Sequence, residues 1–256
     1  MKFLYFILLF TFTLFAQTDQ DIDGVFDSED LCPNTSFKTI VNAQGCAYFG
    51  TFTLQLGEDF SFNTISKRIN NTNIYLNYTY NLWDISLSSS NNNVTNIVTV
   101  SETEDSLYLA FGHTFNSNSL TSKISLGTKF SFMDDTNNSK NNDFFTSLNF
   151  DYSVSQRNNI FLHYTYTISG DSKNVEYQNF HSLSMGMGYA INNKWYSALS
   201  YNYVGSSYDM GTSYKAISWF NYYALPNDFY ISCNYARTLN NYPYNHSISL
   251  NVGMQF

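Results

Sequence analysis

The C-terminal residues 247–256 alternate strictly between small polar and apolar side chains. The apolar positions are Ile248, Leu250, Val252, Met254 and Phe256, and the positions between them carry Ser, Asn, Gly and Gln. Because successive side chains of a strand point to opposite faces of a sheet, this pattern predicts a strand with one apolar and one polar face. A barrel strand between lipid and a wet lumen has this pattern, and so does an amphipathic strand of a soluble protein.

The same two-residue period returns along the chain from about Phe49 onward, and this repetition favours the barrel. The alternating segments come in pairs joined by short turns at 81–82, 116–119, 156–159, 192–194 and 225–228. Longer polar stretches separate the pairs, at 91–105, 132–142, 169–179, 205–213 and 238–245. Short turns at one end and long loops at the other are typical of an outer-membrane barrel.

Counting these segments predicts an all-β fold, an antiparallel transmembrane β-barrel of about 12 strands over residues 48–256. The first strand is expected to start near Phe52. Ten strands are the alternative, because the first strand and the segment 217–224 are ambiguous in phase. Both chain termini are then expected on the side of the short turns, in the periplasm.

The composition agrees with a barrel that is apolar outside and polar inside. Only 12% of the residues are charged, against roughly a quarter in an average soluble domain. The mean hydropathy is nevertheless −0.27, so the polarity comes from neutral residues such as Asn, Ser and Thr. The 23 Phe and 22 Tyr are too many for a disordered chain, and a net charge of −8 gives no support for a nucleic-acid partner.

Tyrosine and tryptophan are expected near the strand ends, where rings with a polar tip suit the lipid headgroup region. The residues assigned to this belt are Trp83, Trp195, Tyr201, Tyr203, Trp219, Tyr222 and Tyr223.

Residues 1–16 are interpreted as an export signal. Lys2 supplies a positive charge, an apolar run extends from Phe3 to Phe15, and Ala16 precedes polar sequence. The run is shorter than the roughly 20 apolar residues that a membrane-spanning helix needs.

Residues 17–47 form an acidic segment that differs from the barrel sequence. Five aspartates and a glycine stand close together there: Asp19, Asp21, Asp23, Gly24, Asp27 and Asp30. Alternating carboxylates on a short turn place hard oxygen atoms on one side, and such oxygens in flexible loops are the ligands that Ca²⁺ takes. The segment is therefore predicted to bind calcium through carboxylate oxygens. An acidic, solvated linker that holds no ion is the alternative.

The spacing overlaps the start of an EF-hand loop, but position 12 counted from Asp19 is Asp30 rather than Glu, and no flanking helices are evident. The segment more fully resembles a thrombospondin type 3 repeat, whose pattern is D-x-D-x-D-G-V-x-D-x-x-D-x-C-P. Asp19 through Pro33 fit this pattern, and Asn42 to Cys46 resembles the end of the same module in bacterial outer-membrane proteins. The resemblance implies that Asp19, Asp21, Asp23, Asp27 and Asp30 coordinate calcium and that Cys32 and Cys46 form a disulfide.

The third cysteine, Cys233, falls at an outward position of a predicted strand, which indicates an inert, lipid-facing thiol. The terminal Phe256 resembles the C-terminal signature of bacterial outer-membrane barrels, where the final Phe is read by the assembly machinery. This resemblance implies the cell outer membrane as location, with membrane lipid and the barrel assembly machinery as partners.

Few charged or ionisable side chains occupy positions predicted to face the barrel interior: Asp84, Lys123, Lys129, Asp151 and His163. A barrel of this size is wide enough for a narrow channel. The two lysines and two aspartates would either form a field across the lumen that orders ions or solutes, or pair with one another and fill it.

Catalytic residues are not predicted. His163 and Thr165 have the two-residue spacing of the His and Ser of outer-membrane phospholipase A, but Thr stands in place of Ser, and no matching Asn motif is evident. His113 and His181 are assigned outward positions, His246 begins the last strand, and no His or Cys triplet for a metal appears.

Three functions remain as hypotheses. The leading one is a porin-like passive channel for small solutes that carries a calcium-binding periplasmic segment. The second is a structural or adhesive barrel whose external loops bind partners, and the third is a small hydrolase dependent on His163. The solute and the oligomeric state are not predicted.

Overall fold

A computed structural model of the chain describes residues 19–33, 35, 41–46, 50–62, 68–95, 105–132, 141–171, 176–209, 211–240 and 245–256. The predicted export signal lies outside these residues. The chain separates into two units, Met1–Tyr48 and Phe49–Phe256, and each is described by itself.

The second unit consists of twelve strands. They are β1 (Thr51–Phe62), β2 (Arg68–Tyr80), β3 (Trp83–Thr95), β4 (Asp105–Ser117), β5 (Leu120–Phe132), β6 (Asp143–Ser153), β7 (Asn158–Ile168), β8 (Phe180–Ala190), β9 (Trp195–Val204), β10 (Tyr214–Ala224), β11 (Phe229–Thr238) and β12 (His246–Gln255). The higher of the two predicted strand counts is therefore confirmed.

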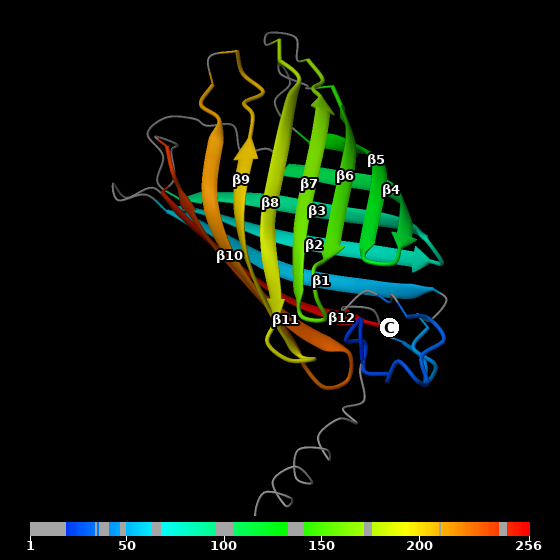
Figure 1. Cartoon of the computed structure of the whole chain (residues 1–256). Coiled ribbons are helices and arrows are strands. Elements are labelled where there is room, and N and C mark those ends of the chain that lie inside the picture. The colour runs from blue at the N-terminus through cyan, green and yellow to red at the C-terminus, as the bar shows by residue number, and fades with distance from the viewer. Residues whose placement is uncertain are drawn as a thin grey trace, which may run out of the picture. The chain divides into compact units, whose positions relative to one another are not determined.

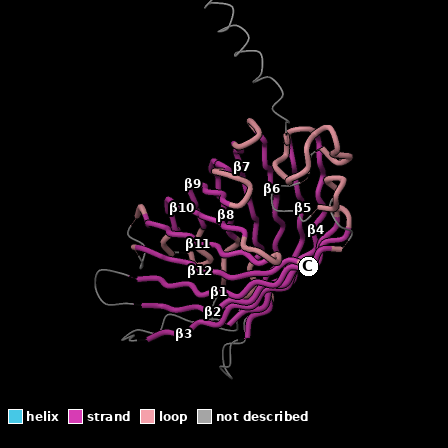
Figure 2. Tube along the Cα trace, turned by 90° about the horizontal axis from the view of Figure 1, so that it is seen from below, coloured by secondary structure: helices cyan, strands magenta, loops and turns pink. Residues whose placement is uncertain are grey.

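Each strand pairs antiparallel with its neighbours in sequence, and β12 pairs with β1 to close the barrel (Figures 1 and 2). The seam continues to the last residue, because Phe52 and Phe256 exchange backbone hydrogen bonds of 2.7 and 2.9 Å. Their rings lie 5.1 Å apart. Closure leaves no open sheet edge, so the strands' backbone groups are satisfied within the wall, as a membrane interior demands.

The connections differ between the two ends of the barrel. At one end the turns are short, and several need a left-handed backbone, which Asn and Asp adopt more readily than other side chains. These turn residues are Asn81, Asn118, Asn227 and Asp228, with φ between 35° and 60°. The long polar connections join the strands at the other end. Phe62 of β1 pairs with Arg68 of β2, and the sequence pattern did not identify a connection between these two strands.

One predicted loop boundary is wrong. The stretch 91–105 was assigned to a loop, but β3 continues to Thr95 and β4 begins at Asp105. The polar end of β3 is rich in Ser and Asn, which are poor strand formers. It remains a strand because it pairs in register with an equally polar part of β2, as in Asn70 with Asn93.

The first unit has little regular structure. A disulfide joins Cys32 to Cys46, as the resemblance implied, and two large apolar side chains of the unit, Phe26 and Leu31, are 41% and 74% exposed. Within the described residues, no helix is long and apolar enough to cross a membrane.

Candidate functional site

The outer face of the barrel is apolar and exposed. Large aliphatic and aromatic side chains stand at alternate positions of every strand from β4 to β10, and examples are Leu126 at 59% and Met187 at 66% exposure. A water-soluble monomer rarely leaves apolar patches beyond a few hundred Å² uncovered, whereas a membrane barrel presents such a band to lipid.

The inner face is polar and made mostly of small residues. All buried polar side chains of the described barrel point inward: Thr53, Asp84, Ser106, Ser125, Asp143, Ser147, Thr167, Ser218 and Ser232. Among the described residues, no large side chain is fully buried. The interior therefore differs from a close-packed protein core, in which large apolar side chains are fully enclosed.

Two of the predicted lumen residues form an ion pair. The Lys123 Nζ on β5 lies 2.8 Å from the Asp84 Oδ2 on β3, and the two side chains are 32% and 8% exposed. They meet across Gly112 of the intervening strand β4, since a Cβ there would lie 2.6 Å from both side chains. The glycine thus makes room for a charge pair that lies flat against the wall.

The other predicted lumen residues are each held by neighbours on the wall. Asp151 accepts a hydrogen bond of 2.7 Å from the Asn159 amide, and Asn159 in turn accepts one of 3.1 Å from the Tyr196 hydroxyl. The Lys129 ammonium group lies 5.9 Å from the centre of the Tyr108 ring.

Two further inward carboxylates escaped the sequence analysis. Asp59 on β1 accepts a hydrogen bond of 3.0 Å from Asn73, and its position two residues from the inward Gly57 was the signal that could have found it. Asp143 opens β6 opposite Lys129, but it directly follows the predicted loop 132–142, and no phase was assigned to it.

His163 belongs to a chain of polar side chains on β6 and β7. Its Nδ1 contacts Asn149, and its Nε2 lies 3.0 Å from the Thr165 hydroxyl, which also lies 2.8 Å from the Ser147 hydroxyl. Sequence inspection found no Asn partner for His163, because cross-strand register brings the Asn into contact. The strand β7 is paired on both sides, so its backbone N–H groups serve the ladder and supply no oxyanion hole of the backbone type.

The aromatic belt is only partly where the sequence pattern put it. Trp83 and Trp195 are the first residues of β3 and β9, as expected. Trp219, however, is the sixth residue of β10 and faces outward in the middle of the strand. Tyr222 faces inward, where its ring lies 5.2 Å from that of Tyr230. Both assignments were wrong because the boundaries and phase of β10 were ambiguous in the sequence.

The outward assignments of His113, His181 and Cys233 are confirmed. Cys233 is the free cysteine of the described chain and pairs in register with the outward Leu250. His113 packs its ring 4.1 Å from that of Trp83. His181 stacks with Tyr164 at 6.4 Å.

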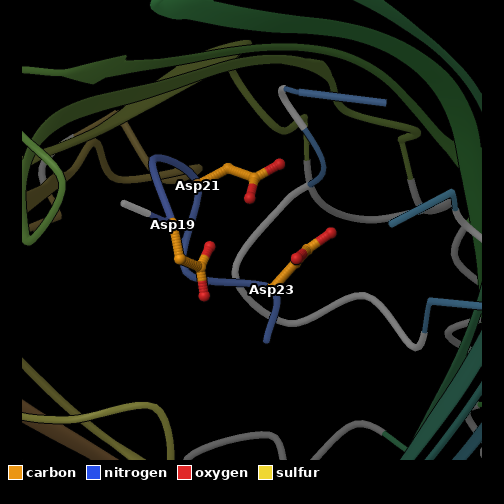
Figure 3. A group of neighbouring side chains, drawn as sticks. All are labelled: Asp19, Asp21 and Asp23. Carbon is orange, nitrogen blue, oxygen red and sulfur yellow. The ribbon is translucent and has the colours of Figure 1, made fainter. Parts of the chain in front are cut away.

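In the first unit, three of the predicted metal ligands come together. Oxygen atoms of Asp19, Asp21 and Asp23 lie within 4.8 Å of one another, and Figure 3 shows the three carboxylates turned toward a common space. Ile22, between them, has a left-handed backbone with φ 60°. For a β-branched residue this conformation is strained, and such strain is concentrated at functional sites.

Backbone N–H groups hold one oxygen atom of each of the three carboxylates. Asp19 accepts from Gly24 at 3.1 Å, Asp21 from Thr35 at 2.6 Å, and Asp23 from Val25 at 2.8 Å. The second oxygen of each carboxylate is buried and has no hydrogen-bond partner. Buried polar atoms normally have partners, so three unpartnered oxygens side by side fit a hard cation.

The electrostatics of the turn agree with this. Burial raises the pKa of Asp21 to about 6, and nearby carboxylates add to the rise while the Thr35 N–H opposes it. Burial likewise raises the pKa of Asp23. Desolvation and like charges both disfavour the ionised form of these carboxyl groups. A divalent cation among the oxygens would offset the free-energy cost of keeping the carboxylates ionised.

Asp27 and Asp30 lie outside this group of three. Asp27 accepts a hydrogen bond of 2.7 Å from the Gln20 N–H, and Asp30 accepts one of 2.7 Å from the Cys32 N–H. Asp30 also covers Gly45, where a Cβ would collide with its carboxylate and lie 3.1 Å from the Asp23 Oδ2. Gly45 has φ +73°, so both its backbone and its lack of a side chain allow Asp30 to approach Asp23.

Comparison with known proteins gives relatives by fold alone. No family model matches the chain, and no curated protein matches its sequence. Among solved structures, the barrel is similar to an outer membrane channel from Pseudomonas putida F1, with a TM-score of 0.61 at 8% identity over 82% of this chain and 97% of that one. It is also similar to the KdgM porin, with a TM-score of 0.57 at 7% identity over 80% and 98%. The NanC porin gives 0.56 at 14% identity over 79% and 98%.

Proposed function

We propose that the chain is a porin-like passive channel for small solutes in the bacterial outer membrane. The observation that carries the proposal is the contrast between the two faces of the closed barrel: exposed apolar side chains outside, and neutral polar side chains without a close-packed core inside. A lumen of this kind admits water, and its lining selects solutes by width, hydrogen bonding and charge.

The comparisons support the same conclusion. The three similar structures described above are one channel and two porins, and the KdgM porin has also been solved in complex with oligogalacturonate. In the proposed arrangement both termini and the short turns face the periplasm, the long loops face outward, and Phe256 is read by the assembly machinery. Short periplasmic turns and longer external loops are the usual orientation of such barrels.

Reversing one lumen charge tests the channel. Lys123→Glu replaces the cation of the Lys123–Asp84 pair by a second carboxylate, so the wall becomes more negative by two charges. We expect the ratio of cation to anion permeability to rise severalfold, measured from the reversal potential under a salt gradient across a planar bilayer.

Lys194→Glu is the matched control, because Lys194 is an exposed residue of the short turn between β8 and β9 and does not line the lumen. It should leave the permeability ratio unchanged. Equal shifts in both variants, or none in Lys123→Glu, would contradict a conducting lumen lined by Lys123. A chain that inserts but passes no current would favour the structural or adhesive hypothesis.

We further propose that the acidic turn of the first unit binds Ca²⁺. The support is the set of three unpartnered oxygens on Asp19, Asp21 and Asp23, with Asp30 beside them and Asp27 bracing the turn. Carboxylate oxygens in a flexible loop suit Ca²⁺, which accepts six to eight oxygen ligands. Backbone carbonyl groups and water would complete the coordination.

The double variant Asp21→Asn/Asp23→Asn tests this proposal. In the wild type, saturating calcium should slow proteolysis within residues 19–46, and chelation should abolish that protection. At a concentration 100 times its Kd, a ligand that binds only the folded form stabilises it by about 2.7 kcal/mol, which is roughly a hundredfold in cleavage rate.

In the double variant, calcium should make no difference to the cleavage rate. Glu29→Gln removes an exposed acidic charge of the same segment and should keep the wild-type response. Calcium-independent cleavage of the wild type would establish the acidic segment as a linker that holds no ion.

A further inference from the structure

A groove on the outer face of the barrel crosses β9, β10 and β11 near the ends that carry the long connections. Its volume is about 630 Å³, and its outward lining side chains are Leu199, Ile217, Trp219, Tyr235, Arg237 and Leu239. The lining is largely apolar, and Arg237 is the one charged residue among these side chains.

A second cation, Lys215, lies next to Arg237. Lys215 is the second residue of β10, and Arg237 is the penultimate residue of β11, so both occupy the same end of the barrel. Arg237 pairs in register with Ile217, and the Lys215 carbonyl group accepts a hydrogen bond of 2.7 Å from Leu239. The two side chains are therefore diagonal neighbours on the outer face, and both are exposed.

The neighbouring strand β12 adds the polar side chain of His246, which contacts Tyr235 of β11, to this surface. His246 opens β12 opposite Arg237, and its Nδ1 lies 2.7 Å from the Tyr235 hydroxyl. Within the described part of the chain, neither Lys215 nor Arg237 forms an ion pair with a carboxylate. The chain has a net charge of −8, yet these two adjacent cations on the lipid-facing surface have no carboxylate partner among the described residues. They are therefore suited to bind an anion that another molecule supplies.

We propose that this groove binds one phosphate-bearing lipid of the leaflet on the long-loop side, such as lipid A. The phosphate group lies against Lys215 and Arg237, and an acyl chain lies along Leu199, Ile217 and Trp219. Arginine binds phosphate through paired N–H donors, and such charge-assisted hydrogen bonds are the strong ones. Cations at the membrane interface cost little there, so the site gains from the lipid without destabilising the barrel.

The inference rests on the proposed membrane location, and native mass spectrometry tests it. The full chain in neutral detergent micelles is mixed with diphosphoryl lipid A, and bound lipids are counted. We expect one retained lipid in the wild type and at least ~10-fold weaker retention in Lys215→Gln/Arg237→Gln, because two charge-assisted contacts are lost. Arg157→Gln/Lys194→Gln, which removes two cations from the short turns at the other end, should retain lipid as the wild type does.

A second arm uses lipid A from which both phosphates have been removed, and its retention should match that of Lys215→Gln/Arg237→Gln with intact lipid A. Equal retention of the two lipids by the wild type, or unchanged retention in the double variant, would overturn the inference. Insertion of the same preparations into vesicles is measured in parallel. Insertion without lipid retention refutes the lipid site alone, whereas failure to insert refutes the membrane barrel itself.

Discussion

Leu126→Arg is expected to destabilise the membrane-inserted barrel by about 2–4 kcal/mol. Leu126 is the seventh of the thirteen residues of β5, faces outward and is 59% exposed. An arginine at this depth would have to lie in hydrocarbon or distort the bilayer to reach water, and its cost is greatest at the bilayer midplane. The free energy of unfolding, measured by urea titration in lipid vesicles with tryptophan fluorescence as the readout, checks the value.

Ser86→Arg is the control for the same added charge on the other face. Ser86 is an inward residue of β3, and its register partners are Asn77 and Ala110. The cost should stay below about 1 kcal/mol because the lumen of the proposed channel holds water. A larger loss of stability in Ser86→Arg than in Leu126→Arg would mean that the faces were assigned the wrong way round.

Replacing Cys32 and Cys46 by serine is expected to destabilise the first unit by about 3 kcal/mol. The bond closes a loop with a sequence separation of 14 residues, and the chain-entropy model gives about this value for such a loop. The unit has few alternatives for holding its turns together, because Phe26 and Leu31 are exposed rather than packed in a core. Cleavage within residues 19–46 should become roughly a hundredfold faster.

The matched control is Cys233→Ser, which changes the free, outward cysteine of β11 and should leave the cleavage rate as it is. The barrel itself should keep its resistance to unfolding in the double serine variant, because the disulfide lies within the first unit. Wild-type cleavage rates in the double variant would contradict a structural role for the bond.

The fold was predictable from the sequence because a period of two fixes the face of every residue in a strand. The alternation in the strand that ends on Phe256 therefore predicted which of its side chains face outward. The outward positions of His113, His181 and Cys233 were predicted from the alternation of their own strands. Strand ends were less predictable. The polar end of β3 has low strand propensity, and it is a strand only because β2 offers a partner in register.

Contacts between inward side chains of different strands were not predictable from the sequence for a different reason. Asp84 and Lys123 lie 39 residues apart, and their ion pair depends on the registers of β3, β4 and β5 together and on the small residue Gly112 between them. His163 meets Asn149 only through the register of β6 and β7. Periodicity gives the face of a residue, but it does not give the height at which two strands align.

The acidic turn was predictable in another way, since its ligands are local in sequence. Asp19, Asp21 and Asp23 are close neighbours along the chain, so any sharp turn brings their carboxylates together. The sequence did not predict that Asp27 and Asp30 lie outside this group of three carboxylates. Their positions depend on which backbone N–H groups each side chain contacts after the turn has formed.

Single-channel recording of the refolded wild-type chain in a planar bilayer tests the central claim most directly. A barrel with a wet, neutral polar lumen should give discrete current steps that scale with salt concentration and persist in Cys233→Ser. A chain that inserts into the bilayer and yields no current steps would contradict a passive channel and leave the barrel as a membrane anchor.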